Sequence, residues 1–188
     1  MIVLLPATVL GMVSDLGLQQ EYSLDFPLSL LFTDIAFFAL LRSFPSDFDR
    51  IGIGLLFFQL LLVVTYIDIN ELKIQGWPFI LILLCGIHPM GIPGIADAII
   101  GLVIISVPLL IFSILTHEAI GHADVELIAV CGFVLGSTRI FFAATVGMVI
   151  SSIVQTFRIM IHKTHRKARC ALAPYFAVGC FFAYLIPF

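Results

Sequence analysis

Two aspartates of this chain stand where a long apolar run meets a polar stretch. Asp68 ends one apolar run and is followed by Ile69-Asn70-Glu71, whereas Asp124 follows Gly121-His122-Ala123 and opens another. Two carboxyl groups that lie close together cannot both ionise easily, so one keeps its proton and the pair can act as acid and base together. Judged by position alone, each aspartate is equally consistent with a helix cap or a marker of the water line. Acid–base chemistry therefore requires a fold that brings the two carboxyl groups together.

The composition places both aspartates in a membrane protein. Of the 188 residues, 61% are hydrophobic and 11% are charged, and the mean hydropathy is +1.18. Soluble domains contain about 45–50% apolar and about 25% charged residues, so a soluble fold could not hide this much apolar surface. In a bilayer, long runs of Leu, Ile and Phe satisfy their own backbone polar groups only as helices. An ionisable residue near the membrane boundary is costly and therefore tends to be functional.

Eight apolar segments predict the helices. They cover approximately residues 1–13, 26–41, 51–67, 77–92, 95–116, 125–137, 140–161 and 170–188. A full crossing takes about 20 residues, so the first, fourth and sixth segments are short and could occupy re-entrant or interfacial positions. No Lys or Arg precedes the first segment and no small-residue cleavage site follows it, which argues against a removable signal peptide. We expect an all-α fold, a polytopic membrane helix bundle with about six to eight transmembrane helices, forming one membrane-embedded domain over residues 1–188.

The orientation follows from the basic residues of short loops, because positively charged loops stay in the cytoplasm. Residues 162–169 carry four of the nine Lys and Arg residues, and Arg158 precedes them. An even number of apolar segments separates this stretch from residues 116–124 and from residues 68–76. All three stretches should therefore lie on the cytoplasmic side of a multi-pass protein of the cytoplasmic membrane. The basic residues that this count places outside are Arg42, Arg50 and Arg139.

Three stretches, in this order, resemble the signatures of one family. They are Asp68 followed by Ile74-Gln75-Gly76, then Gly121-His122-Ala123-Asp124-Val125-Glu126-Leu127 with Gly132 and Gly136, and then Ala173-Pro174-Tyr175-Phe176-Ala177-Val178-Gly179. They are similar to the motifs of the type IV prepilin peptidases, a GxGD-type family of intramembrane aspartyl peptidases. In that family an Asp precedes an Ile-Pro-Asn stretch, a second Asp closes Gly-x-Gly-Asp before Val-Lys-Leu, and the last helix opens on a Pro-containing motif. The resemblance covers about residue 50 to the C-terminus.

Four positions depart from the family pattern. Gln75 and Gly76 stand where the first motif has Pro and Asn, Ala123 replaces the second motif Gly, and Glu126 replaces the Lys. Ala does not easily take a positive φ, so the turn before Asp124 must differ locally or be right-handed. The missing Pro removes a rigid turn, and Glu126 reverses a charge. Both aspartates remain.

The resemblance implies the roles of the site residues. Asp68 and Asp124 would form the catalytic pair of an aspartyl endopeptidase, in which one carboxylate draws a proton from water while the other acid donates to the carbonyl oxygen. Gly121, His122 and Ala123 would support the second motif. The acidic residues expected to attract a basic substrate leader are Glu71, Glu118 and Glu126.

The resemblance also implies the substrate and the partners. The substrate would be a pilin-like precursor with one helix and a short basic leader, cut at the cytoplasmic face of the membrane. The bilayer would be the other partner, and nothing in the charge pattern points to nucleic acid. The sequence has no CxxC pair, which in many bacterial members accompanies N-methylation, so we expect a prepilin leader peptidase without methyltransferase activity. Cys85, Cys131, Cys170 and Cys180 stand singly in apolar stretches and should be buried free thiols.

Other functions stay open at the level of the sequence. A transporter could use Asp34, which lies inside an apolar segment, with Asp68 and Asp124 to bind a cation or relay protons. A non-catalytic relative could bind pilin-like helices without cutting them. A zinc peptidase is disfavoured because His117 and His122 are five residues apart, about 500° around a helix, where HExxH has four. We therefore expect no metal and no cofactor.

Overall fold

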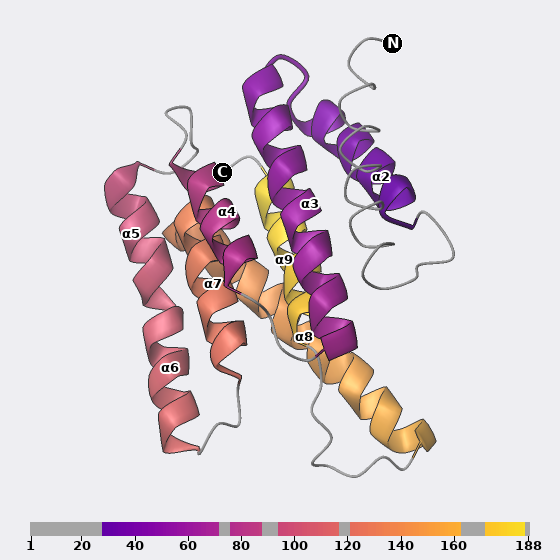
Figure 1. The fold of residues 1–188 in the computed structure, drawn as a ribbon, viewed down its shortest axis with the longest axis vertical. Helices are drawn as coiled ribbons and strands as arrows, with labels where there is room; N and C mark the ends of the chain where they lie inside the picture. Colours follow the sequence, from indigo (N-terminus) through magenta and orange to yellow (C-terminus); the bar gives the residue numbers. More distant parts are fainter. Residues whose placement is uncertain (1–27, 72–75, 88–93, 117–120, 163–171, 187–188) are drawn as a thin grey trace.

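The computed structural model describes residues 28–71, 76–87, 94–116, 121–162 and 172–186, and these ranges contain helices and no strand (Figure 1). The helices are α2 (Leu28–Ser43), α3 (Phe48–Glu71), α4 (Trp77–Gly86), α5 (Ile95–Ile104), α6 (Ser106–Leu115), α7 (His122–Leu135), α8 (Ser137–His162) and α9 (Ala173–Leu185). The all-α expectation is confirmed. The first apolar segment, residues 1–13, lies outside the described residues.

Within the described ranges, three helical stretches are long and apolar enough to cross a membrane. They are Phe48–Asn70, Ile95–Leu115 and Ser137–Arg158, and the shorter apolar helices α4 and α9 accompany them. α5 and α6 together make the second stretch and meet at Ile105. Pro108 follows three residues later, and because proline has no backbone N–H, the regular α-helical hydrogen bonding is interrupted at this junction. The protein is therefore a membrane helix bundle. The number of crossings remains a prediction.

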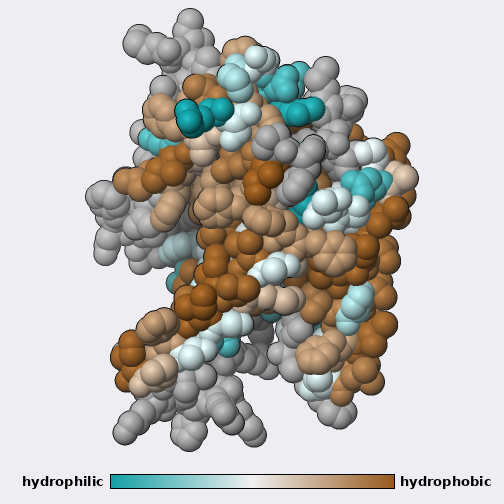
Figure 2. All heavy atoms as spheres, turned by 180° about the vertical axis from the view of Figure 1, so that it is seen from behind, coloured by the Kyte–Doolittle hydropathy of each residue, from teal (hydrophilic) through white to brown (hydrophobic). Residues whose placement is uncertain are grey.

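The side chains that face outward fit this assignment. Large exposed apolar residues cover α5, α6 and α8, including Ile95, Leu115, Phe157 and Met160. Figure 2 shows apolar side chains over much of this face, while strongly hydrophilic side chains gather mainly at its upper end. Such a surface is suited to lipid, because exposed apolar patches of this extent are rare on soluble monomers.

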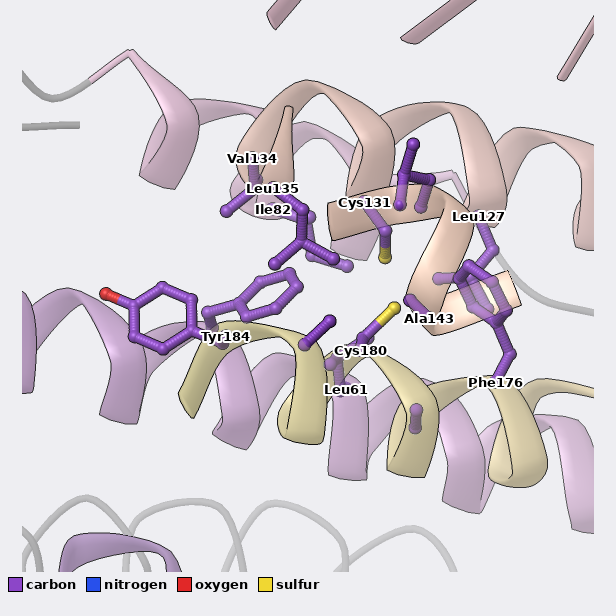
Figure 3. Close-up of a cluster of buried hydrophobic side chains, with 14 of the residues drawn as sticks. Leu61, Ile82, Leu127, Cys131, Val134, Leu135, Ala143, Phe176, Cys180 and Tyr184 are labelled. Atoms are coloured by element: carbon purple, nitrogen blue, oxygen red, sulfur yellow. The ribbon is translucent and has the colours of Figure 1, made fainter. Parts of the chain in front are cut away.

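Helix α7 lies in the middle of the bundle, between α5 and α6 on one side and α3 and α9 on the other (Figure 1). It is apolar around most of its circumference, which is the pattern of a helix buried inside a protein. Leu127 and Cys131 from α7 pack with Leu61 of α3, Ile82 of α4 and Cys180 of α9 in the core (Figure 3). The sixth apolar segment thus corresponds to a short helix that other helices enclose.

Glycines allow α7 to approach its neighbours. A Cβ atom added to Gly132 on α7 would lie 2.2 Å from the carbonyl oxygen of Gly101 on α5, and one added to Gly101 would lie 2.3 Å from that of Gly132. Gly136, which joins α7 to α8, has φ 80°, a conformation that favours glycine. Both later glycines of the second motif therefore have a structural reason, since small residues let membrane helices pack backbone to backbone.

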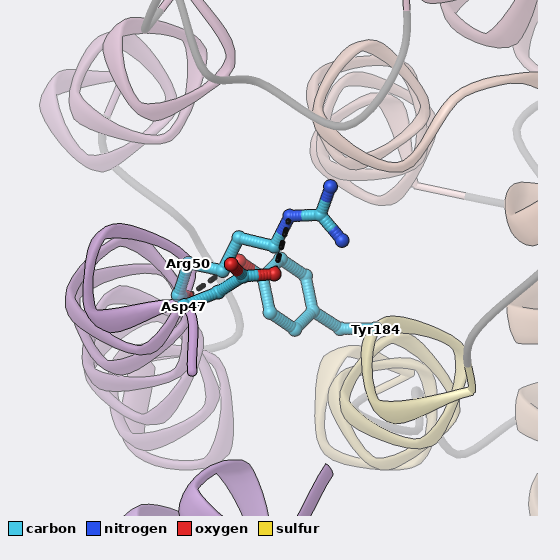
Figure 4. Close-up of polar contacts among 3 residues, drawn as sticks. All are labelled: Asp47, Arg50 and Tyr184. Atoms are coloured by element: carbon cyan, nitrogen blue, oxygen red, sulfur yellow. Dashed lines mark hydrogen bonds and ion pairs between the residues drawn. The ribbon is translucent and has the colours of Figure 1, made fainter. Parts of the chain in front are cut away.

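Polar contacts join the helix ends opposite Asp68. The Tyr184 hydroxyl on α9 donates to the Arg50 carbonyl at 2.8 Å, and the Arg50 side chain lies 3.7 Å from the Asp47 carboxylate (Figure 4). Asp97 of α5 accepts hydrogen bonds from the backbone N–H and hydroxyl of Ser137, the first residue of α8. Asp97, in the first turn of α5, thereby caps the start of α8.

The glycine crossing generates a stability prediction. Gly132→Ala should lower the melting temperature of the purified protein, because its methyl group would overlap the α5 backbone and overpacking costs about 1–3 kcal/mol. Gly52→Ala is the matched control: Gly52 is also helical, but a Cβ there meets nothing within 4 Å. The control should be neutral or slightly stabilising. Equal melting temperatures for the two variants would contradict the close α5–α7 crossing.

Candidate active site

Asp68 lies in the last turn of α3 and is 6% exposed. Its Oδ2 atom accepts a hydrogen bond from the backbone N–H of Ala173, the first residue of α9, at 3.2 Å. A carboxylate inside an apolar bundle is costly unless a polar group compensates it. The α9 amide supplies that compensation.

Asp124 lies in the first turn of α7, outside the three candidate spans. The helix begins because Gly121 takes an extended conformation, φ −63° and ψ 141°, and its carbonyl accepts the N–H groups of Asp124 and Val125 at 3.1 and 3.3 Å. The carboxyl group folds back toward this cap, since a Cβ atom on Gly121 would be 3.2 Å from Asp124 Oδ2. The motif glycine thus leaves room for the Asp124 side chain.

The two carboxyl groups interact electrostatically. The pKa of Asp124 is raised to about 6: burial raises it most, the negative charge of Asp68 adds to the increase, and a hydrogen bond from the Gly121 backbone lowers it in part. A carboxyl group with a pKa near 6 keeps part of its proton close to neutral pH, as a general acid must. The pair therefore offers one acid and one base, although its titration belongs to both groups together.

The fold brings these groups to one end of the bundle. The last turn of α3, the first turn of α7 and the first turn of α9 all lie at the lower end in Figure 1, where α8 also ends. Asp68 and Asp124 are 56 positions apart in the chain, so only the packing of α3, α7 and α9 makes them neighbours.

A protein-family model matches the region of the chain that contains both aspartates. The model of the type IV leader peptidase family matches residues 55–156, which is more than half of the 188 residues and includes both aspartates. The chain belongs to the type IV leader peptidase family. The sequence resemblance to prepilin peptidases is thereby confirmed. No curated protein and no solved structure gave a significant match.

The other residues that were expected at the site fall into two groups. Within the described residues, Glu126 and His122 are exposed on α7, and Ala123 packs against the core. Glu118 lies outside the described residues, as does Gln75, and Glu71 is the last residue of α3, whose side chain is not described. The predicted roles of these residues in substrate binding or motif support remain predictions.

The departures from the family motifs have a structural reading. Ala123 is helical, so the turn before Asp124 is right-handed and needs no positive φ. Gly76 is the N-cap residue of α4, and Pro78 occupies the first turn of that helix. Pro78 presets the backbone at the start of α4, three positions after the place where the family motif has its Pro. A proline is therefore still present near the connection after Asp68.

The transporter alternative gains no support from the position of Asp34. Its neighbour Thr33 donates a hydrogen bond to Gln59 on α3 at 2.7 Å, which places Asp34 at the level of Gln59. Gln59 lies nine residues before Asp68, a rise of about 13 Å along a helix. Oδ1 of Asp34 is buried with no hydrogen-bond partner among the described residues. Asp34 is thus far from the Asp68–Asp124 pair.

Two further expectations concern thiols and metal. Cys131 and Cys180 are buried free thiols in the core, and Cys85 is half-buried, while Cys170 lies outside the described residues. In the described part of the chain, no group of three or more His, Cys, Asp and Glu residues could hold a metal ion. His117 and Glu118, which the zinc alternative would need, lie outside that part.

One partner of the site was not predicted from the sequence. The Ala173-Pro174 stretch matched a family motif, but a backbone amide leaves no trace in residue type. The only sequence signal was the Pro in the first turn of an apolar helix, which marks a helix start and hence a place where free N–H groups point outward.

Gly121 generates a prediction for peptidase activity. Gly121→Ala should lower kcat about tenfold or more, because the added methyl group displaces the Asp124 carboxyl and small misplacements of reacting groups are costly. Gly94→Ala is the matched control, since Gly94 is also an extended N-cap residue, φ −61° and ψ 156°, but its Cβ would meet nothing within 4 Å. Activity of Gly121→Ala equal to that of Gly94→Ala would show that the cap does not position Asp124.

Proposed function

We propose that this chain is an intramembrane aspartyl endopeptidase that removes the leader of type IV pilin-like precursors, with Asp68 and Asp124 as the catalytic pair. One observation carries the proposal: the charge of Asp68 acts on the carboxyl group of Asp124, so two acids from different helices share one end of a membrane bundle. Membership of the type IV leader peptidase family supports the reaction class.

The pair performs hydrolysis without any other reactive group. The ionised carboxylate takes a proton from water while the water oxygen attacks the scissile carbonyl carbon, and the protonated carboxyl gives its proton to the carbonyl oxygen. The tetrahedral intermediate then breaks its C–N bond: the leaving amine takes the proton that water had given up, and one hydroxyl group of the intermediate returns a proton to the other carboxylate as the new carboxyl group forms. The pair ends with one proton, as it began, so no cofactor or methyl donor is consumed.

The position of the pair suggests how a precursor binds. Asp68 ends a candidate membrane span, so a substrate helix lying in the bilayer would bring its end to the same depth. Glu126 is exposed two residues after Asp124 on α7. Together with Glu71 and Glu118 it would attract the basic leader that precedes the substrate helix, and added salt should weaken that attraction.

The distribution of basic residues supports a cytoplasmic location for this end. Arg158 is exposed near the end of α8, at the Asp68 end of the bundle, and the basic stretch 162–169 begins there. At the other end, Arg50 is paired with Asp47, and Arg139 is buried where it interacts with Tyr184 and Asp97. The positive-inside rule counts Lys and Arg in loops, and Arg139 lies inside the bundle.

The first test concerns catalysis. Asp68→Asn and Asp124→Asn should each abolish cleavage of co-expressed pilin-like precursors, because each removes one half of the acid–base pair. Asp49→Asn is a matched control, since Asp49 is an exposed carboxylate at the opposite end of α3. Substantial cleavage by either pair variant would refute the assignment. A wild-type chain that binds precursors without cutting them would instead identify a non-catalytic relative.

The second test concerns orientation. Single cysteines replace Asn70 and His122, which are exposed beside the pair, and Ser46, which is exposed at the far end of α3, in a variant lacking the native cysteines. In intact cells, a membrane-impermeant thiol reagent should label only the Ser46 variant, because positively charged loops remain inside. Labelling of the Asn70 or His122 variant from outside would place the pair on the wrong face for a cytoplasmic leader.

A further inference from the structure

Asp68 is held by an element far from it in the sequence. The Ala173 amide that donates to Asp68 Oδ2 belongs to a residue 105 positions later, and both partners are buried, Ala173 at 1% and Asp68 at 6% exposure. A hydrogen bond to an ionised acceptor is about twice as strong as one between neutral groups. This contact can therefore influence both the direction and the charge state of the carboxyl group.

The first turn of α9 explains why this amide is available. The N–H groups of Tyr175 and Phe176 both donate to the Leu172 carbonyl at 3.2 Å, and Pro174 has no N–H. No side-chain cap bonds the helix at Leu172. The first amides of a helix have no acceptor within it and carry the positive end of the helix dipole. Asp68 thus acts as the cap of α9, and its ionised form fills that role best.

The packing of α9 fixes the donor in place. A Cβ atom on Gly179 would lie 2.3 Å from the Ala143 carbonyl oxygen, and one on Gly147 would lie 3.0 Å from Cα of Phe176. At the other end of α9, the Tyr184 hydroxyl is bonded to the Arg50 backbone. Because α9 is held along α8 and at its far end, the Ala173 amide can direct Asp68 rather than follow it.

Among the side chains that the structure describes around Asp68, one acid is its electrostatic partner. Of the helices packed against α3, neither α4 nor α9 contains Asp, Glu, Lys, Arg or His, and the titratable groups they bring are thiols and phenols such as Tyr175. α2 contributes Asp34, at the level of Gln59, and Arg42 in its last turn. Asp124 on α7 is the described acid whose charge interacts with Asp68.

We propose that the Ala173 backbone N–H is a positioning group of the catalytic pair, which keeps Asp68 ionised as the base that takes a proton from water and leaves Asp124 as the acid. This inference rests on the proposed peptidase function. With Oδ2 bonded to α9, the oxygen that receives the water proton is Oδ1. The Ala-Pro start of α9 thereby contributes to catalysis without supplying a reactive side chain.

Substitution of Ala173 provides the first experiment. Ala173→Pro removes the N–H and breaks no hydrogen bond inside α9, whereas Ala173→Gly keeps the N–H and loses only the methyl group. Ala173→Pro should lower kcat about tenfold or more with KM within about twofold, since the amide acts on the base and not on substrate binding. The acidic limb of its pH–rate profile should move up by about one unit. Matching kcat and pH profiles for the two variants would overturn the inference.

A second measurement does not depend on how Ala173→Pro folds. Leu172–Ala173 is the only Leu–Ala pair in the sequence, so ¹³C-carbonyl Leu with ¹⁵N-Ala labelling identifies the Ala173 amide uniquely. Its proton shift should change with pH in the wild type, as the Asp68 carboxyl group ionises, and should stay constant in Asp68→Asn. An amide that does not respond to pH in the wild type, or that titrates unchanged in Asp68→Asn, would refute the contact.

The two proposals fail in different ways. If the wild-type chain cleaves no precursor, or if Asp68→Asn still cleaves, the proposed peptidase function is wrong whatever the amide does. If cleavage depends on both aspartates while Ala173→Pro behaves as Ala173→Gly, the peptidase function stands and the role of α9 is wrong.

Discussion

Helices α5 and α7 cross with their backbones in contact, and the position of Asp124 depends on that crossing. Between membrane helices the hydrophobic effect contributes little, because lipid is as apolar as Leu, so close packing must hold the bundle together. Gly101 and Gly132 permit an approach that any Cβ atom would block. The left-handed backbone at Gly136 then turns the chain directly into α8. A 14-residue helix can therefore occupy the centre of the bundle and present its first turn to the end of α3.

Hydrogen bonds at the helix ends fix how far each helix is shifted along its neighbours, which apolar packing alone would leave variable. Apolar side chains of α3, α7 and α9 interdigitate in the core, but such contacts tolerate sliding and rotation better than a hydrogen bond does. The carboxylate of Asp68 and the carbonyl of Arg50 lie at opposite ends of α3, and each bonds to α9. Asp97 joins α5 to the start of α8 in the same manner. Each contact satisfies a group that would be expensive to leave unpaired in a bilayer.

The two ends of the bundle have different electrostatic environments. At one end, carboxyl groups come together, and the pKa of Asp124 rises through burial and the charge of Asp68. At the other end, the cations Arg50 and Arg139 have acidic or phenolic neighbours in Asp47, Asp97 and Tyr184. A pair of acids is useful for hydrolysis because repulsion keeps one of them protonated. In our proposal α9 breaks the symmetry of the pair, because its first amide favours the ionised form of one member.

The sequence by itself determined the membrane class, the helical fold, the approximate helix limits and the family. The apolar composition indicates a membrane protein, and long apolar runs satisfy their backbone polar groups in a bilayer as helices. The motifs around Asp68 and Asp124 stand in the chain order that the family shows. The sequence could not determine which helices touch, because apolar side chains are alike in their preference for the interior. Only the tertiary structure decided that α7 is central, that Ala123 continues a right-handed helix, and that Asp34 is remote from the pair. It alone showed the bond from Ala173 to Asp68, since a backbone amide is common to every residue except proline.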